Sequence, residues 1–127
     1  LPWPVEKGHI SGYFGKHQHP IHEHVTIDNK GIYLQTVTGA DARAIYEGEV
    51  TWCAPMNGNY AVIVQHGNYR SVYSPLKKIY VKQGDKLTAK QAIGEIYTNT
   101  SEDNKTELYF QIYKDRSILN PGLWLAQ

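Results

Sequence analysis

An all-β domain, folded as an antiparallel sandwich or barrel, is the architecture that this 127-residue sequence predicts. Ten tyrosines, three tryptophans and eleven glycines give the chain the composition of a β-protein, and it lacks the long Ala/Leu/Glu/Lys runs that are typical of helices. Apolar and polar residues alternate in short segments, as they do in half-buried strands. Turn-forming residues separate these segments at short intervals.

The expected strands follow from this alternation. In chain order they are Gly31–Thr36, Ala42–Tyr46, Glu49–Cys53, Tyr60–His66, Tyr69–Ser74, Ile79–Val81, Gln91–Tyr97 and Thr106–Lys114. Turns are expected where residues tolerate a positive φ, at Glu47-Gly48, Asn57-Gly58, Gly67-Asn68 and Gln83-Gly84-Asp85. The polar segment Thr98–Lys105 predicts an exposed hairpin loop, and Gly122–Leu125 predicts one helical turn that docks Trp124.

Strand Thr106–Lys114 carries the most information about function, because side chains alternate between the two faces of a strand. The face expected to be core consists of Leu108, Phe110 and Ile112. The opposite face is polar and aromatic, and consists of Glu107, Tyr109, Gln111 and Tyr113. Strand Gly31–Thr36 sorts in the same way, with Ile32 and Leu34 on one face and Tyr33 and Gln35 on the other.

Charge and cysteine content exclude several classes of protein. The 13 basic and 12 acidic residues give a net charge of +1 and are spread along the chain, so a nucleic acid is not an expected partner. The single Cys53 cannot form an internal disulfide, and its neighbours suggest a half-buried structural thiol. No apolar run reaches the roughly 18 residues of a membrane span, and the first ten residues do not resemble a signal peptide. We expect one domain over residues 1–127.

Motifs along almost the whole chain are shared, in the same order, with one family of domains. The first part contains Leu1-Pro2-Trp3-Pro4-Val5, Gly12-Tyr13-Phe14-Gly15, His19-Pro20 and Asn29-Lys30-Gly31-Ile32. The rest contains Ala44–Val50, Val62–Asn68, Val72–Leu76, Val81–Lys86, Ile93-Gly94, Leu108–Ile112, Asn120-Pro121 and Trp124-Leu125. Together they resemble zinc endopeptidase domains of the lysostaphin (LytM) type, which implies the LytM fold, a duplicated hybrid motif of antiparallel strands.

Active LytM-type domains hold zinc with a His-x-Gly-x-Asp segment and with the second histidine of a His-x-His strand. These ligands leave a fourth position for the activated water. The resemblance places the ligands at Asn29, Tyr33 and Tyr109, where an amide and two neutral phenols are poor zinc ligands. The two assisting histidines fall at Glu107 and at Pro75, and a proline cannot transfer a proton. The resemblance therefore implies no bound metal, no cofactor and no hydrolysis.

A LytM-type core without these residues resembles the degenerate domains of EnvC-type murein hydrolase activators. The implied function is activation of a periplasmic N-acetylmuramoyl-L-alanine amidase during septal peptidoglycan splitting. A segment of the amidase would enter the vestigial cleft, expected between strands Gly31–Thr36 and Thr106–Lys114 and including Gln111. EnvC-type proteins carry an N-terminal coiled coil. We therefore expect this chain to be the carboxy-terminal module of a longer periplasmic protein, with any membrane contact outside the module.

Two other functions stay open from the sequence. A peptidoglycan-binding module would use the same groove for stem peptide or glycan. An active zinc endopeptidase would need displaced ligands from His17, His19, His22 and His24, but Pro20 interrupts this cluster and no neighbouring residue completes a known zinc spacing. A biotinyl carrier is excluded, because no Met-Lys-Met-like turn is present.

Several of these aromatic and acidic residues also have purely structural interpretations. Trp3, Trp52 and Trp124 are expected to pack in the core or at its edge. Tyr33 and Tyr109 would pack under a loop with their hydroxyls hydrogen-bonded, and Glu107 would be an ordinary solvated carboxylate. Only the folded arrangement decides between these interpretations.

Overall fold

The computed structural model describes residues 1–18 and 26–126 of the chain. Its strands are β1 (His9–Gly12), β2 (Gly15–Gln18), β3 (Thr26–Asn29), β4 (Ile32–Thr36), β5 (Asp41–Arg43), β6 (Gly48–Met56), β7 (Asn59–His66), β8 (Tyr69–Ile79), β9 (Lys86–Leu87), β10 (Ala92–Ile96), β11 (Thr98–Asn99), β12 (Lys105–Lys114) and β13 (Ser117–Leu119). The helical elements described are two short 3-10 turns, η1 (Thr100–Glu102) and η2 (Pro121–Leu123). The predicted all-β class is therefore confirmed.

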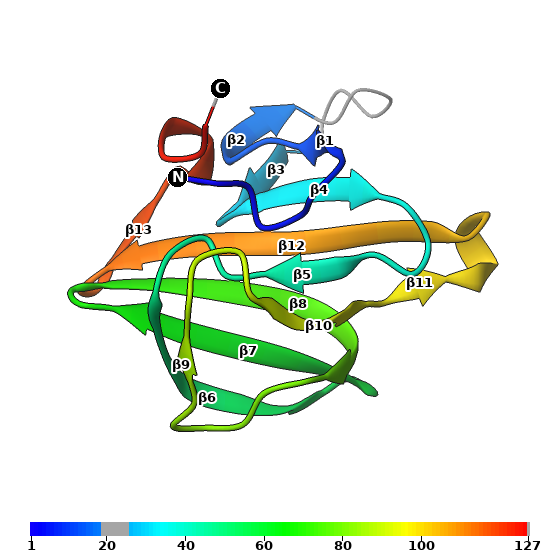
Figure 1. Ribbon diagram of the computed structural model, residues 1–127. Coiled ribbons are helices and arrows are strands. Elements are labelled where there is room, and N and C mark those ends of the chain that lie inside the picture. Colours follow the sequence, from blue (N-terminus) through cyan, green and yellow to red (C-terminus); the bar gives the residue numbers. More distant parts are fainter. Residues whose placement is uncertain (19–25, 127) are drawn as a thin grey trace.

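One large antiparallel sheet dominates the fold, in the order β1-β4-β12-β8-β7-β6-β9 (Figure 1). Strand β8 changes partner along its length. Its first part, Tyr69–Ser74, pairs with β12, and its last part pairs with β10, which also pairs with β5. Pro75 stands at this change of partner, where its missing N–H does not interrupt either ladder. β2 and β3 form a separate two-stranded sheet.

Two tight turns set the register of the central strands. Asn57 and Gly58 join β6 to β7 with φ of 53° and 83°, the left-handed conformation that two-residue hairpin loops require. Gly67, with φ 66°, opens the turn between β7 and β8, in which His66 pairs with Tyr69. The predicted turns at both places are confirmed.

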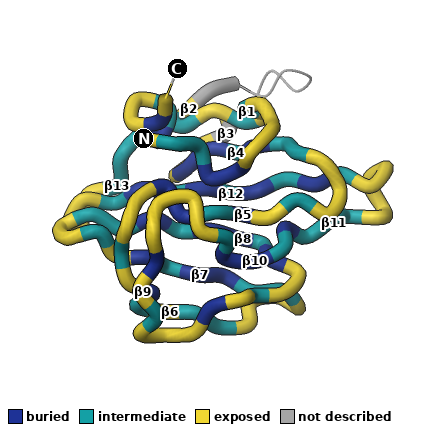
Figure 2. The backbone as a smooth tube through the Cα atoms, viewed as in Figure 1, coloured by how far each residue is buried: buried dark blue, intermediate teal, exposed yellow. Residues whose placement is uncertain are grey.

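The apolar faces of β4 and β12 form the centre of the core, as expected. Ile32, Leu34, Leu108, Phe110 and Ile112 are all at most 3% exposed. In Figure 2 buried backbone runs along β12, β7 and β10, whereas the hairpin tips are exposed. The alternation of side chains along β12 therefore assigns its two faces correctly.

Two strand predictions, Ala42–Tyr46 and Ile79–Val81, were wrong in extent. The expected strand Ala42–Tyr46 is shortened to β5. Beyond β5, the backbone of Ala44 bonds to Lys90 and Gln91, and the N–H of Ile45 donates to the Tyr73 hydroxyl. Ile79–Val81 is not a separate strand, because β8 runs on through Pro75 to Ile79.

The other elements differ from expectation mainly at their ends. The loop Thr98–Lys105 is exposed at its tip, but Thr98 and Asn99 extend the hairpin by pairing with Thr106 and Lys105. The helical turn expected at Gly122–Leu125 starts one residue earlier, as η2, where the Asn120 side chain accepts from the N–H of Gly122. No helix in the described part of the chain is long and apolar enough to cross a membrane.

The two ends of the described chain lie side by side (Figure 1). The N–H of Ala126 donates to the carbonyl of Leu1 at 2.7 Å, and the Trp3 indole N–H donates to the carbonyl of Ala126 at 2.7 Å. Trp3 also packs against the core, whereas Trp124 lies at its edge with its ring centre 5.3 Å from that of Tyr69. Trp52 is 42% exposed, and Cys53 is half-buried as expected.

Candidate functional site

Tyr33 and Tyr109 lie side by side on the outer face of the sheet, the face opposite the core. They are directly paired residues of β4 and β12, and their ring centres are 4.7 Å apart with a 33° tilt. Gly12 of β1 pairs with Tyr33, and a Cβ added at Gly12 would lie only 2.7 Å from the tyrosine ring. A glycine at this position therefore lets β1 lie closely against the tyrosine pair.

The chain between the end of β3 and the start of β4 lies close to the tyrosine pair. Asn29 donates its side-chain N–H to the carbonyl of Tyr13 at 2.9 Å. The backbone N–H of Lys30 donates to the hydroxyl of Tyr109. A Cβ at Gly31 would collide with the carbonyl of Phe110, so the loop approaches β12 as closely as a glycine allows.

Glu107 lies two residues from Tyr109 on the same face of β12. Its carboxylate accepts a hydrogen bond from the Ser11 hydroxyl at 2.5 Å and lies 3.6 Å from the Lys105 ammonium. Because a serine hydroxyl donates to this carboxylate and a lysine ammonium pairs with it, the carboxylate is held in place rather than free in solvent.

The two hydroxyls of the pair favour the neutral phenol. Burial, followed by the negative charge of Glu107, raises the pKa of Tyr33. Burial and then the neighbouring Tyr33 raise the pKa of Tyr109. Both side chains are therefore protonated at neutral pH, because even an unperturbed tyrosine titrates only near pH 10.

These residues do not fit a zinc ion. Zinc sites use deprotonated thiolates, carboxylates or neutral imidazoles, whereas here two neutral phenols stack on each other and the amide of Asn29 is bonded to a carbonyl. Within residues 1–18 and 26–126, no three His, Cys, Asp or Glu side chains gather in a way that could hold a metal. The predicted histidine cluster includes His19, His22 and His24, which lie outside the described residues, and His17 is described only as backbone of β2.

The groove expected between strands Gly31–Thr36 and Thr106–Lys114 is not a gap between separate strands. β4 and β12 are hydrogen-bonded neighbours, so the side chains of Tyr33 and Tyr109 pave a continuous sheet surface. A hollow of about 290 Å³ lies further along this face, where Gln111 and Tyr113 of β12 meet Arg70 and Val72 of β8 and Ile63 of β7. Gln111, which donates to the Tyr113 hydroxyl at 3.1 Å, therefore belongs to the rim of a real depression.

A row of paired residues, apolar except for Gln111, runs across the sheet through this hollow. Gln111 pairs with Val72, Val72 with Ile63, and Ile63 with Trp52, so the row spans β12, β8, β7 and β6. Pro75 lies one residue beyond Ser74, the β8 partner of Tyr109, and its carbonyl accepts from the N–H of Tyr97. The structure thus brings Tyr33, Glu107, Tyr109 and Gln111 onto one face of the sheet, with Asn29 in the neighbouring strand β3 and Pro75 in β8.

Sequence reasoning missed several residues of this face. Ser11 lies in β1, for which no alternation was recognised, so no local signal pointed to its bond with Glu107. Val72 and Ile63 also face away from the core, but their neighbours do not mark this direction. Ile63 lies between the apolar Val62 and Val64, and Val72 lies between Ser71 and Tyr73, which are both buried.

Comparison with known proteins places this geometry among related domains. Residues 27–121 match Peptidase family M23. A protein of Haemophilus influenzae is 34% identical over 98 residues, which are 76% of this chain and 24% of that protein. Stage II sporulation protein Q of Bacillus subtilis is 37% identical over 99 residues, which are 73% of this chain and 35% of that protein. The solved SpoIIQ–SpoIIIAH pore-forming complex contains a chain that superposes with a TM-score of 0.81 and 26% identity, covering 98% of this chain and 90% of that chain.

Proposed function

The chain belongs to peptidase family M23, and on that premise we propose that it is a non-catalytic member that binds and activates another cell-wall enzyme. The observation that carries the proposal is the stacked Tyr33–Tyr109 pair. By resemblance, these tyrosines stand where active family members have zinc ligands, and their neutral phenols do not fit a zinc ion. The proposed partner is a periplasmic N-acetylmuramoyl-L-alanine amidase acting in septal peptidoglycan splitting.

The chemistry of the outer face supports protein binding. It combines aromatic rings with the fixed carboxylate of Glu107, and tyrosine and tryptophan are enriched among the residues that dominate binding energy. The hollow beside Gln111 and the row ending at Trp52 extend this surface across the sheet. A related solved chain is part of a two-protein complex, SpoIIQ with SpoIIIAH, which is a precedent for binding a protein on this fold.

The test is an amidase assay with dye-labelled peptidoglycan and the purified chain, run against a panel of periplasmic amidases. Tyr33→Ala and Tyr109→Ala should each lower the apparent affinity for the cognate amidase about 30-fold, the loss expected when a central interface tyrosine contributes about 2 kcal/mol. Tyr80→Ala is the matched control, since Tyr80 is 49% exposed and bonds to Asp41, away from this face.

The outcomes separate this function from its rivals. Equal stimulation by the Tyr33, Tyr109 and Tyr80 variants would show that the outer face is not the activating surface. Binding of the chain to purified sacculi without amidase stimulation, lost in the same two variants, would identify a peptidoglycan-binding module instead. Zinc-dependent release of dye by the chain alone would show that the chain is an active endopeptidase.

A further inference from the structure

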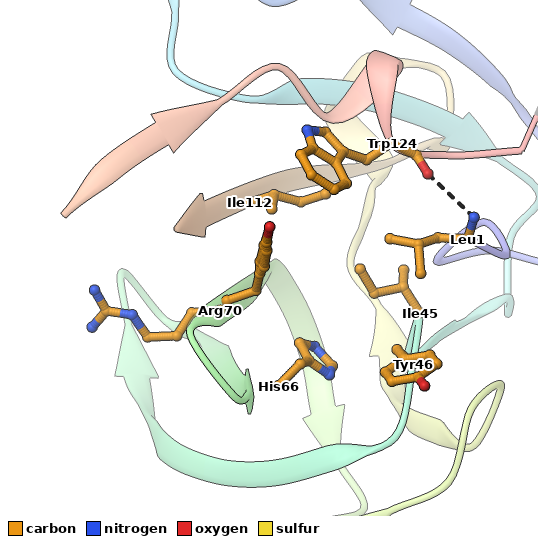
Figure 3. Close-up of a pocket in the computed structure, with 8 residues that line it drawn as sticks. Leu1, Ile45, Tyr46, His66, Arg70, Ile112 and Trp124 are labelled. Carbon is orange, nitrogen blue, oxygen red and sulfur yellow. Dashed lines mark hydrogen bonds between the residues drawn. The ribbon is translucent and has the colours of Figure 1, made fainter. Parts of the chain in front are cut away.

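A second hollow lies on the core side of β12. A pocket of about 400 Å³ opens between the loop after β5, the β7–β8 turn, β12 and the segment after η2 (Figure 3). Ile45 and Ile112, each 3% exposed, form its base. Its walls are aromatic, and Tyr46 and Trp124 remain 50% and 40% exposed although they line the pocket.

Both nitrogens of His66, which lines the pocket, are already engaged within the protein. His66 Nδ1 lies 2.8 Å from the carbonyl of Glu47, which can only accept, so this nitrogen carries the hydrogen. In the neutral ring Nε2 then accepts from the Ser71 hydroxyl at 2.7 Å. Ser71 accepts in turn from Tyr73 at 2.8 Å, and the hydroxyl of Tyr73 accepts from the N–H of Ile45. His66 therefore presents a neutral, fixed ring to the pocket and no unused nitrogen.

This arrangement selects an apolar group. A dry cavity of about 150 Å³ holds benzene, so the pocket has room for a leucine or phenylalanine side chain. Sites for free small molecules usually offer a few unpaired polar groups that fix the orientation of the ligand. His66 uses both nitrogens inside the protein and so offers an occupant no hydrogen bond. A mainly apolar wall of this kind suits an anchor side chain, which a partner's own backbone orients.

The rim adds a charge preference. The stem of Arg70 lines the pocket, while its guanidinium points away and donates to the carbonyl of Asp115 (Figure 3). Lys114 places its ammonium 5.7 Å from the ring centre of Tyr69. The Lys114 ammonium, beside a ring that lines the pocket, favours a carboxylate next to the inserted side chain.

We propose that this pocket is a docking site for a protein segment that inserts one leucine- or phenylalanine-sized side chain and carries an acidic residue beside it. Arg70 also lines the hollow beside Gln111, so the pocket and the outer face meet at this residue. The inference rests on the proposed function only in taking the partner to be a protein. It does not depend on the identity of that partner or on the Tyr33–Tyr109 pair.

The test uses the 127-residue chain and a minimal probe, N-acetyl-Phe-Glu-amide, followed by ¹H–¹⁵N NMR. The amides of Tyr46, His66 and Trp124 should shift saturably, with a Kd of about 1 mM for so small a ligand. Trp124→Ala should weaken binding about tenfold by removing one wall. Trp52→Ala is the matched control, because Trp52 is 42% exposed, like Trp124 at 40%, but lies on the outer face. N-acetyl-Phe-Lys-amide should bind about threefold more weakly.

Several results would overturn the proposal: shifts that do not saturate, equal weakening by Trp52→Ala, binding of the lysine probe as tight as that of the glutamate probe, or saturation of the same amides by N-acetylglucosamine. If the spectrum of Trp124→Ala shows that this variant does not fold, Tyr46→Ala takes its place. Tyr46 is 50% exposed, so its truncation should leave the fold intact. Tyr33→Ala and Tyr109→Ala should bind the probe normally. Failure of the probe therefore refutes the pocket and leaves the amidase proposal to its own assay.

Discussion

At the scale of single residues, Tyr33 and Tyr109 stand at the positions that, by resemblance, correspond to zinc ligands in active family members. Tyr33 and Tyr109 stack at 4.7 Å, and the N–H of Lys30 is bonded to the Tyr109 hydroxyl. Nearby, Glu107 is bonded to Ser11 and close to Lys105. These interactions hold the side chains in one arrangement, which suits a binding surface, since rigid side chains lose less conformational entropy when a partner docks.

Restoring ligands at these positions should restore metal binding. In the triple variant Asn29→His, Tyr33→Asp, Tyr109→His, the direct pairing of residues 33 and 109 keeps two of the new ligands adjacent. We expect uptake of about one zinc ion by calorimetry, because three such ligands form an ordinary zinc site. Peptidoglycan cleavage should stay absent, since Pro75 and Glu107 still stand where the family's assisting histidines would be. A folded triple variant that takes up no zinc would show that these positions do not correspond to the metal site.

His66 should make the stability of the domain depend on pH. Burial lowers the pKa of His66 below its ordinary value of 6.5, so the folded chain resists protonation while the unfolded chain accepts it. The contribution of His66 to the free energy of unfolding is therefore complete above pH 6.5 and is lost as the pH falls from there through the lowered pKa. Protonation would also make Nε2 a donor and disturb the bonds through Ser71 to Tyr73.

Urea unfolding at pH 7.5, 6.0 and 5.0 measures this effect. The unmodified chain should lose more stability over this range than His66→Gln, whose side chain does not titrate. Parallel pH profiles for the two proteins would mean that His66 is not responsible.

At the scale of elements, β12 separates stability from binding on its two faces. Leu108 is fully buried, whereas its neighbour Tyr109 is half-buried on the outer face. Leu108→Ala should lower the free energy of unfolding by about 2–5 kcal/mol through the cavity that it leaves. Tyr109→Ala should cost about 1 kcal/mol, because it loses a ring contact and one hydrogen bond but opens no core cavity.

Denaturant unfolding of both variants, analysed with a common slope, provides the comparison. Destabilisation by Tyr109→Ala as large as that by Leu108→Ala would show that the tyrosine pair is part of the core. Loss of amidase stimulation in that variant could then not be assigned to the interface.

At the scale of the whole molecule, distant segments are combined into two separate surfaces. The outer face takes residues from β4, β12, β8 and β7, and the pocket takes residues from both ends of the chain and from its centre. The bonds from Ala126 to Leu1 and from Trp3 to Ala126 tie these ends together and so fix the position of Trp124. Arg70 contributes to both surfaces, which allows one partner to contact them together.

The sequence by itself determined the all-β class, the central turns and the faces of β4 and β12. These features are local, because the alternation of side chains and the positive φ of Asn57, Gly58 and Gly67 follow from a few neighbouring residues. The family resemblance also selected Tyr33, Glu107 and Tyr109, which the fold then brings onto one face, and Asn29, which lies at the end of β3.

Only the tertiary structure decided which groups satisfy one another. The early end of β5, the bond between Ser11 and Glu107, the direct pairing of β4 with β12, and the pocket around Ile45 all join residues far apart in the chain. Ser11 and Glu107 are separated by 96 positions, and Ile45 and Tyr73 by 28. No local period encodes such pairs, because their partners are chosen by how the curled sheet packs and by the need of buried polar groups to find a hydrogen bond.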